Sequence, residues 1–596
     1  MKELAVLNKY FLKYRWRLLL GIFFVSLSNY FRVLQPQIIR EALDMVVENI
    51  NTYYLLEGFA LQGVFFAKLS KILLFFGVMV LLLAVLMGIF MYFMRQTIIV
   101  MSRLIEYDMR KELFAHYEKL TIAFYKRNNT GDLMARISED VSKVRMYLGP
   151  AVLYGINLLS LFVMVIYSML QVNVTLTLYS LAPLPILSIS IYYVSNLINR
   201  KSTVIQQQLA RLNSIAQEVY SGIRVVKSYV QEKTTGRHFA DESDNYRGKS
   251  LELAKVDAFF YPLMLLLIGT STIITVYVGG VQMVKGAVTP GNIAEFVIYV
   301  NMLTWPVTAI GWIASIIQQA AASQKRINEF LETQPEISNP IVAPVAFNGD
   351  LVFDQVSFTY VDTGIQALDE VSFSLKAGQK MAIIGRTGSG KTTIADLLVR
   401  MYDPITGKIT IDGQDLRELD LANLRQRVGY VPQDIFLFSD TVANNIAFGR
   451  PGIDQALIEQ FARYAAVYDD IQGLTHGFET LVGERGVTLS GGQKQRISIA
   501  RALIKEPDLI VLDDCLSAVD TNTEKQILEY FSGALADKTA IIITHRIYSL
   551  IQFDKIIVLE DGKVVENGTH EELIGQKGYY ADLFEKQSLE EADSSN

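Results

Sequence analysis

Residues 385–393 read GRTGSGKTT and match the spacing G-x-x-x-x-G-K-[ST] of a phosphate-binding loop. Glycines without side chains let backbone amides curl around phosphates, and the helix that follows points its positive end at them. In this pattern Lys391 neutralises the outer phosphates and the hydroxyl of Thr392 holds Mg²⁺. The stretch therefore predicts a nucleoside triphosphate site, whose binding residues are Gly385, Arg386, Thr387, Gly388, Ser389, Gly390, Lys391, Thr392 and Thr393.

A second motif supplies the acids that hydrolysis needs. DLIVLDD at 508–514 reads as a buried strand that ends in two carboxylates, and α/β sheets bind ligands at the carboxyl ends of their strands. Asp513, at the end of the strand, is predicted to bind the Mg²⁺ shell, and Asp514 is predicted to face the attacking water. The two aspartates therefore take different roles in a predicted nucleoside triphosphatase.

The elements around these motifs predict an α/β P-loop domain over residues 350–583. Strand-like LVFDQVSFTY and KMAIIG flank the turn AGQ, and the second strand leads into the glycine loop and the helix TTIADLLVRMY. A charged stretch, SQKRINEFLETQPE, and the proline-bearing residues 335–348 predict a linker over 326–349. The polar end of the chain, residues 584–596, is expected to be disordered.

The first 325 residues are predicted to form an α-helical membrane domain. The chain is 51% hydrophobic, and its long apolar stretches are gathered in this half. Stretches of about 20 apolar residues can cross the bilayer. Six such spans are predicted, near residues 17–38, 71–94, 148–170, 174–197, 257–284 and 291–320.

The distribution of charge predicts the orientation of these spans. Lysines and arginines crowd residues 2–17, whereas Asp44, Glu48 and Glu57 follow the first span, so the N-terminus is expected on the cytoplasmic side. An even number of spans then places residues 95–147, residues 198–256 and the ATPase domain in the cytoplasm. This predicts an integral protein of a bacterial-type inner or plasma membrane. The opening residues, with apolar and lysine side chains interleaved, could form an amphipathic helix along the inner leaflet.

Some polar residues inside the spans could line a central path for a transported molecule. These candidates are Arg32, Gln35, Asn157, Glu295 and Asn301. Arg32 and Glu295 lie towards the outer ends of their spans, so snorkelling to the interface is an equally simple interpretation.

Two bulk properties narrow the function further. The net charge of −6 gives no sign of a nucleic-acid partner. The single cysteine, Cys515, excludes an internal disulfide framework and offers no metal-site spacing; it reads as a small buried residue beside the carboxylates.

Further motifs make the chain resemble the ATP-binding cassette (ABC) family. LSGGQ at 489–493, followed by KQRISIARAL, resembles the signature of that family, and its other motifs follow in the family's order. Tyr360 resembles the aromatic residue that stacks on adenine, and Gln433 in YVPQD resembles the glutamine that senses metal and attacking water. GERG at 483–486 resembles the loop that touches the membrane domain, SAVD at 517–520 the loop ending in Asp520 that crosses to the partner, and His545 the histidine that contacts the γ-phosphate.

The resemblance implies a dimer of half-transporters of the exporter type, with ATP and Mg²⁺ as cofactors. In such a dimer the signature residues Leu489, Ser490, Gly491, Gly492 and Gln493 act on the nucleotide bound to the other chain. It also implies that residues 122–134 and 213–227 are coupling helices in the cytoplasmic loops, although each could be an ordinary surface helix.

Asp514 departs from the family pattern, which has Glu at this position. Asp is shorter by one methylene, which moves the carboxylate by roughly 1 Å, and a misplacement of about 1 Å can cost on the order of 100-fold in rate. We therefore expect this site to bind ATP and hydrolyse it slowly, unless a backbone shift restores the reach.

Because the LSGGQ motif is intact, the hypothesis is a heterodimeric exporter of amphipathic, drug-like or lipid substrates, in which the partner chain carries the Glu. A homodimeric lipid flippase and an ATP-gated regulator or channel are the alternatives.

Overall fold

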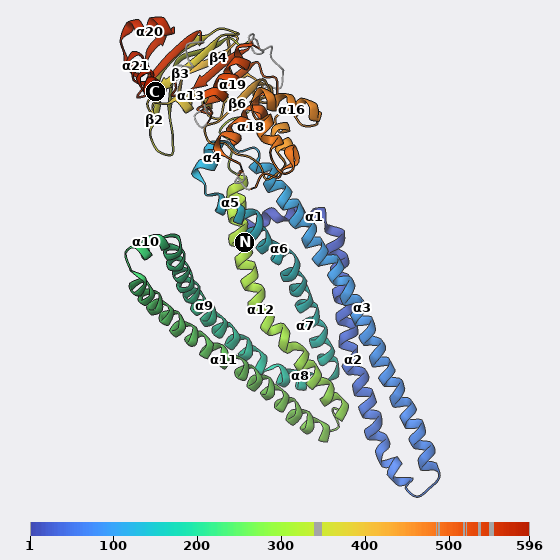
Figure 1. Cartoon of the computed structure of the whole chain (residues 1–596). Helices are drawn as coiled ribbons and strands as arrows, with labels where there is room; N and C mark the ends of the chain where they lie inside the picture. Colours follow the sequence, from blue (N-terminus) through green and yellow to red (C-terminus); the bar gives the residue numbers. More distant parts are fainter. Residues whose placement is uncertain are drawn as a thin grey trace. The chain divides into compact units, whose positions relative to one another are not determined.

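The computed structural model describes residues 2–338, 349–483, 486, 489–516, 519, 521–533, 538–547 and 553–594. The chain divides into two compact units (Figure 1). The first comprises Met1–Glu118 and Gly131–Thr333, and the second comprises Lys119–Thr130 and Gln334–Asn596. The short segment 119–130 thus belongs with the C-terminal unit through its contacts, although membrane-unit helices lie on both sides of it in the sequence.

The first unit contains helices and turns but no β-strand over its described residues. Six of its helical stretches are long and apolar enough to cross a membrane, which confirms the six predicted spans: Arg15–Leu55, Leu61–Tyr117, Thr130–Val172, Val174–Ser221, Glu232–Val284 and Pro290–Leu331. Its elements are η1 (Lys2–Leu7), α1 (Asn8–Lys13), α2 (Arg15–Leu55), α3 (Leu61–Tyr117), α5 (Thr130–Ala135), η2 (Arg136–Asp140), α6 (Val141–Met146), η3 (Tyr147–Ala151), α7 (Val152–Val172), α8 (Val174–Leu181), α9 (Pro183–Ser221), α10 (Ile223–Ser228), α11 (Glu232–Val284) and α12 (Pro290–Leu331).

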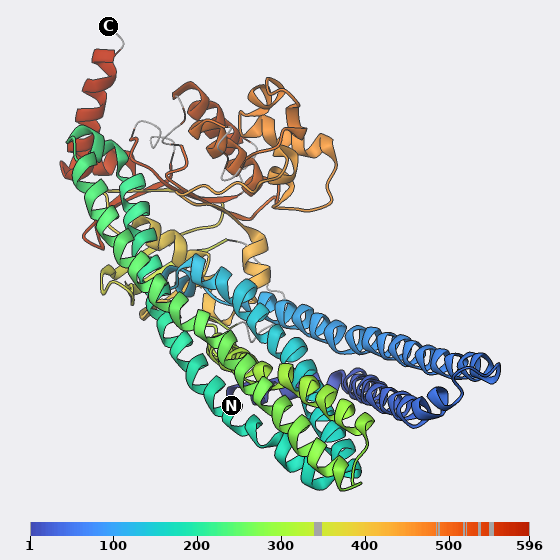
Figure 2. The ribbon, with the colours of Figure 1, turned by 90° about the horizontal axis from the view of Figure 1, so that it is seen from below.

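Two helix pairs flank the middle of this unit. Helices α2 and α3 run side by side, as do α9 and α11, and α7 and α12 lie between the two pairs in both views (Figures 1 and 2). The short turns between spans carry helix caps that explain where the chain reverses. Asn173 accepts a hydrogen bond from the backbone N–H of Leu176 at 2.9 Å, and Thr289 with Asn292 forms a capping box ahead of Pro290.

Two of the polar candidates in the spans are bound within the protein. Glu295 is fully buried, and its Oε2 accepts a hydrogen bond from Arg40 of α2 at 3.2 Å, so Glu295 does not snorkel. The amide of Asn301 donates to the carbonyl of Val297 in its own helix at 2.8 Å. Burying an unpaired carboxylate is costly, which explains why Glu295 has Arg40 as its partner.

The opening segment packs on protein. Leu4, Leu7 and Tyr10 are buried in the first unit. Lys9 pairs with Glu112 at 2.7 Å and Lys13 with Asp108 at 2.6 Å, both on α3. The amphipathic pattern is therefore used to attach this segment to the C-terminal part of α3, while Leu12 and Trp16 stay exposed.

The second unit contains two β-sheets. A small antiparallel sheet has the order β2-β1-β4-β5, and a larger sheet has the order β10-β9-β3-β8-β7-β6. The strands from β9 to β6 are parallel, and β10 pairs antiparallel to β9. The bounds are β1 (Leu351–Thr359), β2 (Gln366–Leu375), β3 (Lys380–Gly385), β4 (Thr406–Ile411), β5 (Gln414–Asp415), β6 (Val428–Val431), β7 (Leu509–Asp513), β8 (Thr539–Ile543), β9 (Lys555–Glu560) and β10 (Lys563–Gly568).

Helices surround the larger sheet, which confirms the predicted α/β class. They are α4 (Ile122–Arg127), α13 (Lys391–Leu398), η4 (Leu416–Glu418), α14 (Leu421–Arg427), α15 (Val442–Ala447), α16 (Gln455–Tyr464), α17 (Tyr468–Gln472), η5 (Gly477–Glu479), α18 (Gly491–Leu503), α19 (Thr521–Gly533), α20 (His570–Gln576) and α21 (Tyr579–Ser594).

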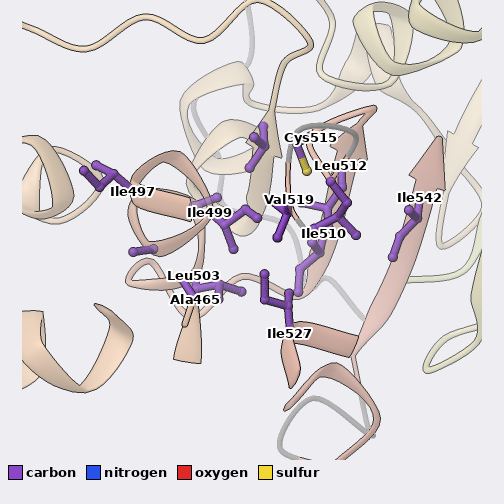
Figure 3. Packing of buried hydrophobic residues seen from close by; sticks show 14 of the residues in the cluster. Ala465, Ile497, Ile499, Leu503, Ile510, Leu512, Cys515, Val519, Ile527 and Ile542 are labelled. Atoms are coloured by element: carbon purple, nitrogen blue, oxygen red, sulfur yellow. The ribbon is translucent and has the colours of Figure 1, made fainter. Parts of the chain in front are cut away.

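Strands buried on both faces read as continuous apolar runs, and β7 and β8 are buried at every residue. Figure 3 shows the core on one side of these strands, where Ile510 and Leu512 of β7 meet Ile499 and Leu503 of α18. Cys515 lies in this core and is buried, as its small apolar character suggested.

The element boundaries differ from the expected ones at two places. Helix α12 continues to Leu331, so residues 326–331 of the expected linker are helical; residues 339–348 of that linker lie outside the described residues. Helix α21 runs to Ser594, whereas residues 584–596 were expected to be disordered. Composition alone missed α21 because its apolar side chains Tyr580, Leu583 and Phe584 are few, yet their helical spacing places them together on the core.

Candidate nucleotide-binding site

Four parallel strands deliver the predicted site residues to one edge of the larger sheet. Strand β3 ends at Gly385, where the glycine loop begins, and β7 ends at Asp513. Gln433 follows the end of β6, and His545 follows the end of β8. Since these strands are parallel neighbours, their carboxyl ends meet at one edge, which is where α/β sheets bind ligands.

The glycine loop needs glycine for steric reasons. Gly385, Gly388 and Gly390 have φ values of +154°, +84° and +99°. A Cβ atom on Gly385 would overlap the carbonyl oxygen of Leu559, and one on Gly390 would overlap that of Ala367. The loop can therefore hold this shape only with glycine at these positions, and α13 begins directly after Gly390.

Lys391 is held against the loop from which it extends. Its Nζ donates to the carbonyl oxygens of Gly385 and Arg386, both at 2.8 Å. Burial lowers the pKa of Lys391, and the nearby carboxylates of Asp514 and Asp513 oppose that change. The ammonium group is thus fixed at the mouth of the loop, where a terminal phosphate would be bound.

Asp513 is a buried carboxylate without a full set of partners. It is 1% exposed, and its Oδ2 atom has no hydrogen-bond partner among the described residues. Burial raises its pKa to about 6, although the hydroxyl of Thr392 and the charge of Lys391 act in the opposite direction. An acceptor oxygen beside a threonine hydroxyl fits Mg²⁺, which prefers a few protein oxygens together with phosphate oxygens.

Asp514 lies next to Gln433 and has an unusual backbone conformation. The Nε2 atom of Gln433 donates to Oδ2 of Asp514 at 3.4 Å, and the backbone N–H of Asp514 donates to Ile543 at 2.9 Å. The φ angle of Asp514 is +48°, a region that Asp and Asn enter more readily than most side chains. The two residues predicted to handle water are therefore in contact.

Tyr360 lies at the other end of the site. Its hydroxyl is 3.1 Å from the hydroxyl of Thr393, and its ring lies edge-on to Tyr402, with the ring centroids 5.6 Å apart. Lys126 of α4 places its Nζ 5.1 Å from the centroid of the Tyr360 ring, within the range of a cation–π contact. Lys126 belongs to residues 122–134, which the family resemblance implies to be a coupling helix, and it touches the residue predicted to stack on the base.

These side chains line one cavity of about 290 Å³. Most of the predicted residues contribute to it: Tyr360, Thr387, Gly388, Gly390, Lys391, Thr392, Thr393, Gln433, Asp513, Asp514 and His545. Gly385, Arg386 and Ser389 shape the loop without lining this cavity.

Sequence reasoning missed Ile365, Ala367 and Ile543 in the cavity wall. Ile543 could have been found as the last residue of the strand before His545, whereas Ile365 and Ala367 are carried in by the β1–β2 hairpin, which no motif marks.

The signature residues are built as a helix cap. The hydroxyl of Ser490 accepts a hydrogen bond from the backbone N–H of Gln493 at 3.2 Å. In turn, the side-chain oxygen of Gln493 accepts one from the backbone N–H of Ser490 at 3.0 Å. Gln493 also donates to Asp470 at 3.1 Å, and Arg496 pairs with Asp470 at 2.7 Å. Ser490 and Gly491 are exposed at the start of α18.

No signature residue lines the cavity of the glycine loop over the described part of the chain. The two halves of the predicted site are therefore separate within this chain. Asp520 and residues 484 and 485 of GERG lie outside the described residues.

Comparison with known proteins identifies the family. Residues 18–307 match the family model described as "ABC transporter transmembrane region", and residues 368–517 match "ABC transporter". The chain is 35% identical over 591 residues to the probable multidrug resistance ABC transporter ATP-binding/permease protein YheI of Bacillus subtilis (strain 168), covering 98% of each chain. The chain belongs to the ABC transporter family. It is an integral membrane protein that couples ATP hydrolysis to transport.

Other similar proteins share this organisation. The multidrug resistance-like ATP-binding protein MdlA of Escherichia coli (strain K12) is 35% identical over 594 residues, which cover 99% of this chain and 98% of that protein. An ATP-dependent lipid A-core flippase of Pseudomonas fluorescens (strain Pf0-1) is 35% identical over 478 residues, covering 80% and 79%. The structure of a bacterial Atm1-family ABC exporter with ATP bound matches with a TM-score of 0.75 and 27% identity, covering 96% of this chain and 99% of that one.

Proposed function

We propose that this ABC transporter chain is one half of a heterodimeric exporter that moves amphipathic or hydrophobic molecules, drug-like or lipid, out of the membrane or the cell. The proposed partner is a second half-transporter with Glu at the position of Asp514. Similarity to multidrug resistance transporters and to a lipid A-core flippase supports the substrate class. The ATPase unit is proposed to face the cytoplasm, because lysines and arginines cluster before the first span.

The observation that supports the heterodimer proposal is that Asp514 occurs in a chain whose LSGGQ signature is intact. The glycine loop, Lys391 and Asp513, which lie at one cavity, are proposed to bind ATP, and Ser490 is exposed at the start of α18. The carboxylate of Asp514 is one methylene shorter than that of Glu and lies at 3.4 Å from Gln433, a long hydrogen bond. This chain would thus bind ATP tightly, hydrolyse it slowly, and lend its signature to the partner's faster site.

The residues of the cavity that belong to the predicted motifs each have a role in this proposal. Tyr360 stacks on the base, the backbone of the glycine loop and Lys391 hold the phosphates, and Thr392, Gln433 and Asp513 would hold Mg²⁺. Bound Mg²⁺ would neutralise charge on the transferred phosphoryl group. Asp514 positions the attacking water, and His545 contacts the γ-phosphate.

ATP can move the membrane helices only through a difference in affinity between conformations. In the proposed cycle, ATP clamped between Lys391 of one chain and Ser490 of the other favours the closed ATPase pair. Hydrolysis at the partner's site removes that preference. Lys126, on the segment between two membrane helices, contacts Tyr360 and offers one route by which the base contact reaches the membrane unit.

The test is to purify the tagged chain from its native membrane, identify any copurifying half-transporter, and compare ATPase rates with Asp514→Glu and Asp514→Asn. We expect a second chain in equal amount, a chain alone with slow ATPase, and a rise of about 10- to 100-fold with Asp514→Glu in the chain alone. A stable dimer of this chain alone with fast ATPase that Asp514→Glu does not raise would contradict the heterodimer. That result would favour a homodimeric lipid flippase, which the 35% identity to the lipid A-core flippase supports.

A further inference from the structure

The C-terminal helix α21 is attached firmly to the ATPase core by its first turns. Tyr580 is fully buried, its hydroxyl is 2.6 Å from Nδ1 of His570, and its backbone N–H donates to Glu566 at 3.2 Å. Leu583 and Phe584 pack against the same core. Leu583 and Phe584 follow Tyr580 by three and four positions, so the three residues form one face of the helix.

At the end of the same face, the side-chain amide of Gln587 forms hydrogen bonds with the loop that contains His545. Gln587 lies two turns after Tyr580. Its Nε2 atom donates to the carbonyl oxygen of His545 at 2.7 Å, and its Oε1 atom accepts from the backbone N–H of Ile547 at 2.8 Å. One side chain thus satisfies two backbone groups on both sides of Arg546, because a side-chain amide supplies a donor and an acceptor together.

Arg546 holds the same loop from its other side. Its Nη1 atom donates to Glu524 of α19 at 2.6 Å and to the carbonyl oxygen of Val519 at 3.1 Å. The loop after β8 is therefore fixed between α21 and the segment that precedes α19. The side chain of His545, between these two attachments, is exposed and lines the nucleotide cavity.

Helix α21 also reaches the glycine loop. The guanidinium carbon of Arg386 lies 5.7 Å from the centroid of the Tyr579 ring, within cation–π range. The carbonyl oxygen of Arg386 accepts a hydrogen bond from Lys391. One helix therefore contacts both loops that would surround the terminal phosphate of ATP.

We propose that Gln587 is a positioning residue for the γ-phosphate: it holds the backbone of His545 so that the imidazole reaches the terminal phosphate of ATP. The inference rests on the proposed role of His545 in the ATP site. It predicts that the loss of Gln587 weakens the binding of ATP and leaves the binding of ADP unchanged, since ADP has no γ-phosphate. A residue that served only the stability of the fold would affect both nucleotides alike.

The experiment uses the full-length chain in its membrane complex. Photolabelling of this chain with 8-azido-ATP and Mg²⁺ is competed with ATP and, separately, with ADP, and the ratio of the two affinities is the readout. Gln587→Met keeps the length and bulk of the side chain but removes its donor and acceptor. Lys586→Met is the matched control, because Lys586 is the exposed neighbour on the same helix. His545→Ala is the reference for losing the γ-phosphate contact.

We expect Gln587→Met to lower the ATP-over-ADP ratio about 5- to 30-fold, in line with the net worth of two hydrogen bonds, with Lys586→Met unchanged. The double variant with His545→Ala should lose no more than His545→Ala alone. An unchanged ratio in Gln587→Met, or an equal loss of ATP and ADP binding, overturns the inference. If His545→Ala itself leaves the ratio unchanged, the proposed role of His545 fails and the inference fails with it.

Discussion

Asp513→Asn should stabilise the ATPase unit while abolishing its response to Mg²⁺. Asp513 is 1% exposed and its pKa is raised to about 6, mainly by burial. The difference from an ordinary aspartate pKa near 4 corresponds to about 3 kcal/mol. The charged carboxylate lowers the free energy of unfolding by about this amount at neutral pH. Asn has nearly the same shape without the charge, so this cost should fall.

The pH dependence gives the sign of this effect. The unfolded chain loses the proton of Asp513 near pH 4 and the folded chain near pH 6, so the folded state binds more protons between these values. The stability of the natural protein from this group therefore falls as the pH rises from about 4 to about 6 and stays at the lower level above it. The advantage of Asp513→Asn should be largest at pH 7.5, about half as large at pH 5, and close to zero at pH 4.

Thermal unfolding of the full chain in detergent, without nucleotide or metal, measures this effect. An upper value of about 3 kcal/mol corresponds to about 6–12 °C for a domain of this size. Asp454→Asn is the matched control, because Asp454 is exposed and its side chain caps no backbone group. With ATP already present, added Mg²⁺ should raise the midpoint of the natural protein further and leave that of Asp513→Asn nearly unchanged. An equal or lower midpoint for Asp513→Asn at pH 7.5 would refute the idea that Asp513 is a buried charge held ready for a metal.

Two further substitutions test the ends of the site. Tyr360→Leu should weaken ATP binding to this chain about 10- to 100-fold by removing a stacking surface, whereas Tyr360→Phe should keep most of the affinity; equilibrium binding of ATP measures both, and equal losses would contradict stacking. Ser490→Ala should cost about 1 kcal/mol of local stability through the lost helix cap, seen as faster hydrogen exchange at residues 491–494. In the proposed heterodimer Ser490→Ala should also lower total ATPase more than Asp514→Asn does, and the opposite order would contradict a signature lent to the partner.

Much of the fold follows from sequence patterns that depend on local chemistry alone. The six spans are visible because each must present about 20 apolar residues to lipid. The glycine loop is visible because Gly385 and Gly390 sit where a Cβ atom would overlap a carbonyl oxygen. The acids are visible because the buried strand β7 ends in polar residues, which an apolar interior would not accept.

The contacts that sequence did not reveal join segments that lie far apart in the chain. Lys126 and Tyr360 are more than two hundred positions apart, and no periodic pattern in the sequence predicts that they are in contact. Gln587 is a polar residue near the end of the chain, and composition there indicates disorder. The packing of Tyr580, Leu583 and Phe584 on the core directs Gln587 towards His545, so its role depends on tertiary structure.

The backbone conformation of Asp514 adds a second interpretation to the short reach of its side chain. With φ at +48°, the position favours Asp over Glu on conformational grounds, because the shorter acid enters this region at lower cost. The same shortness reduces its reach towards a water molecule. Glu can also hold this conformation, as Glu370 and Glu506 do with φ at +51°, but it does so less readily than Asp. In the proposed heterodimer, a site that binds ATP and hydrolyses it slowly would keep its phosphate-binding loop and could keep Asp at position 514, where the backbone conformation suits it.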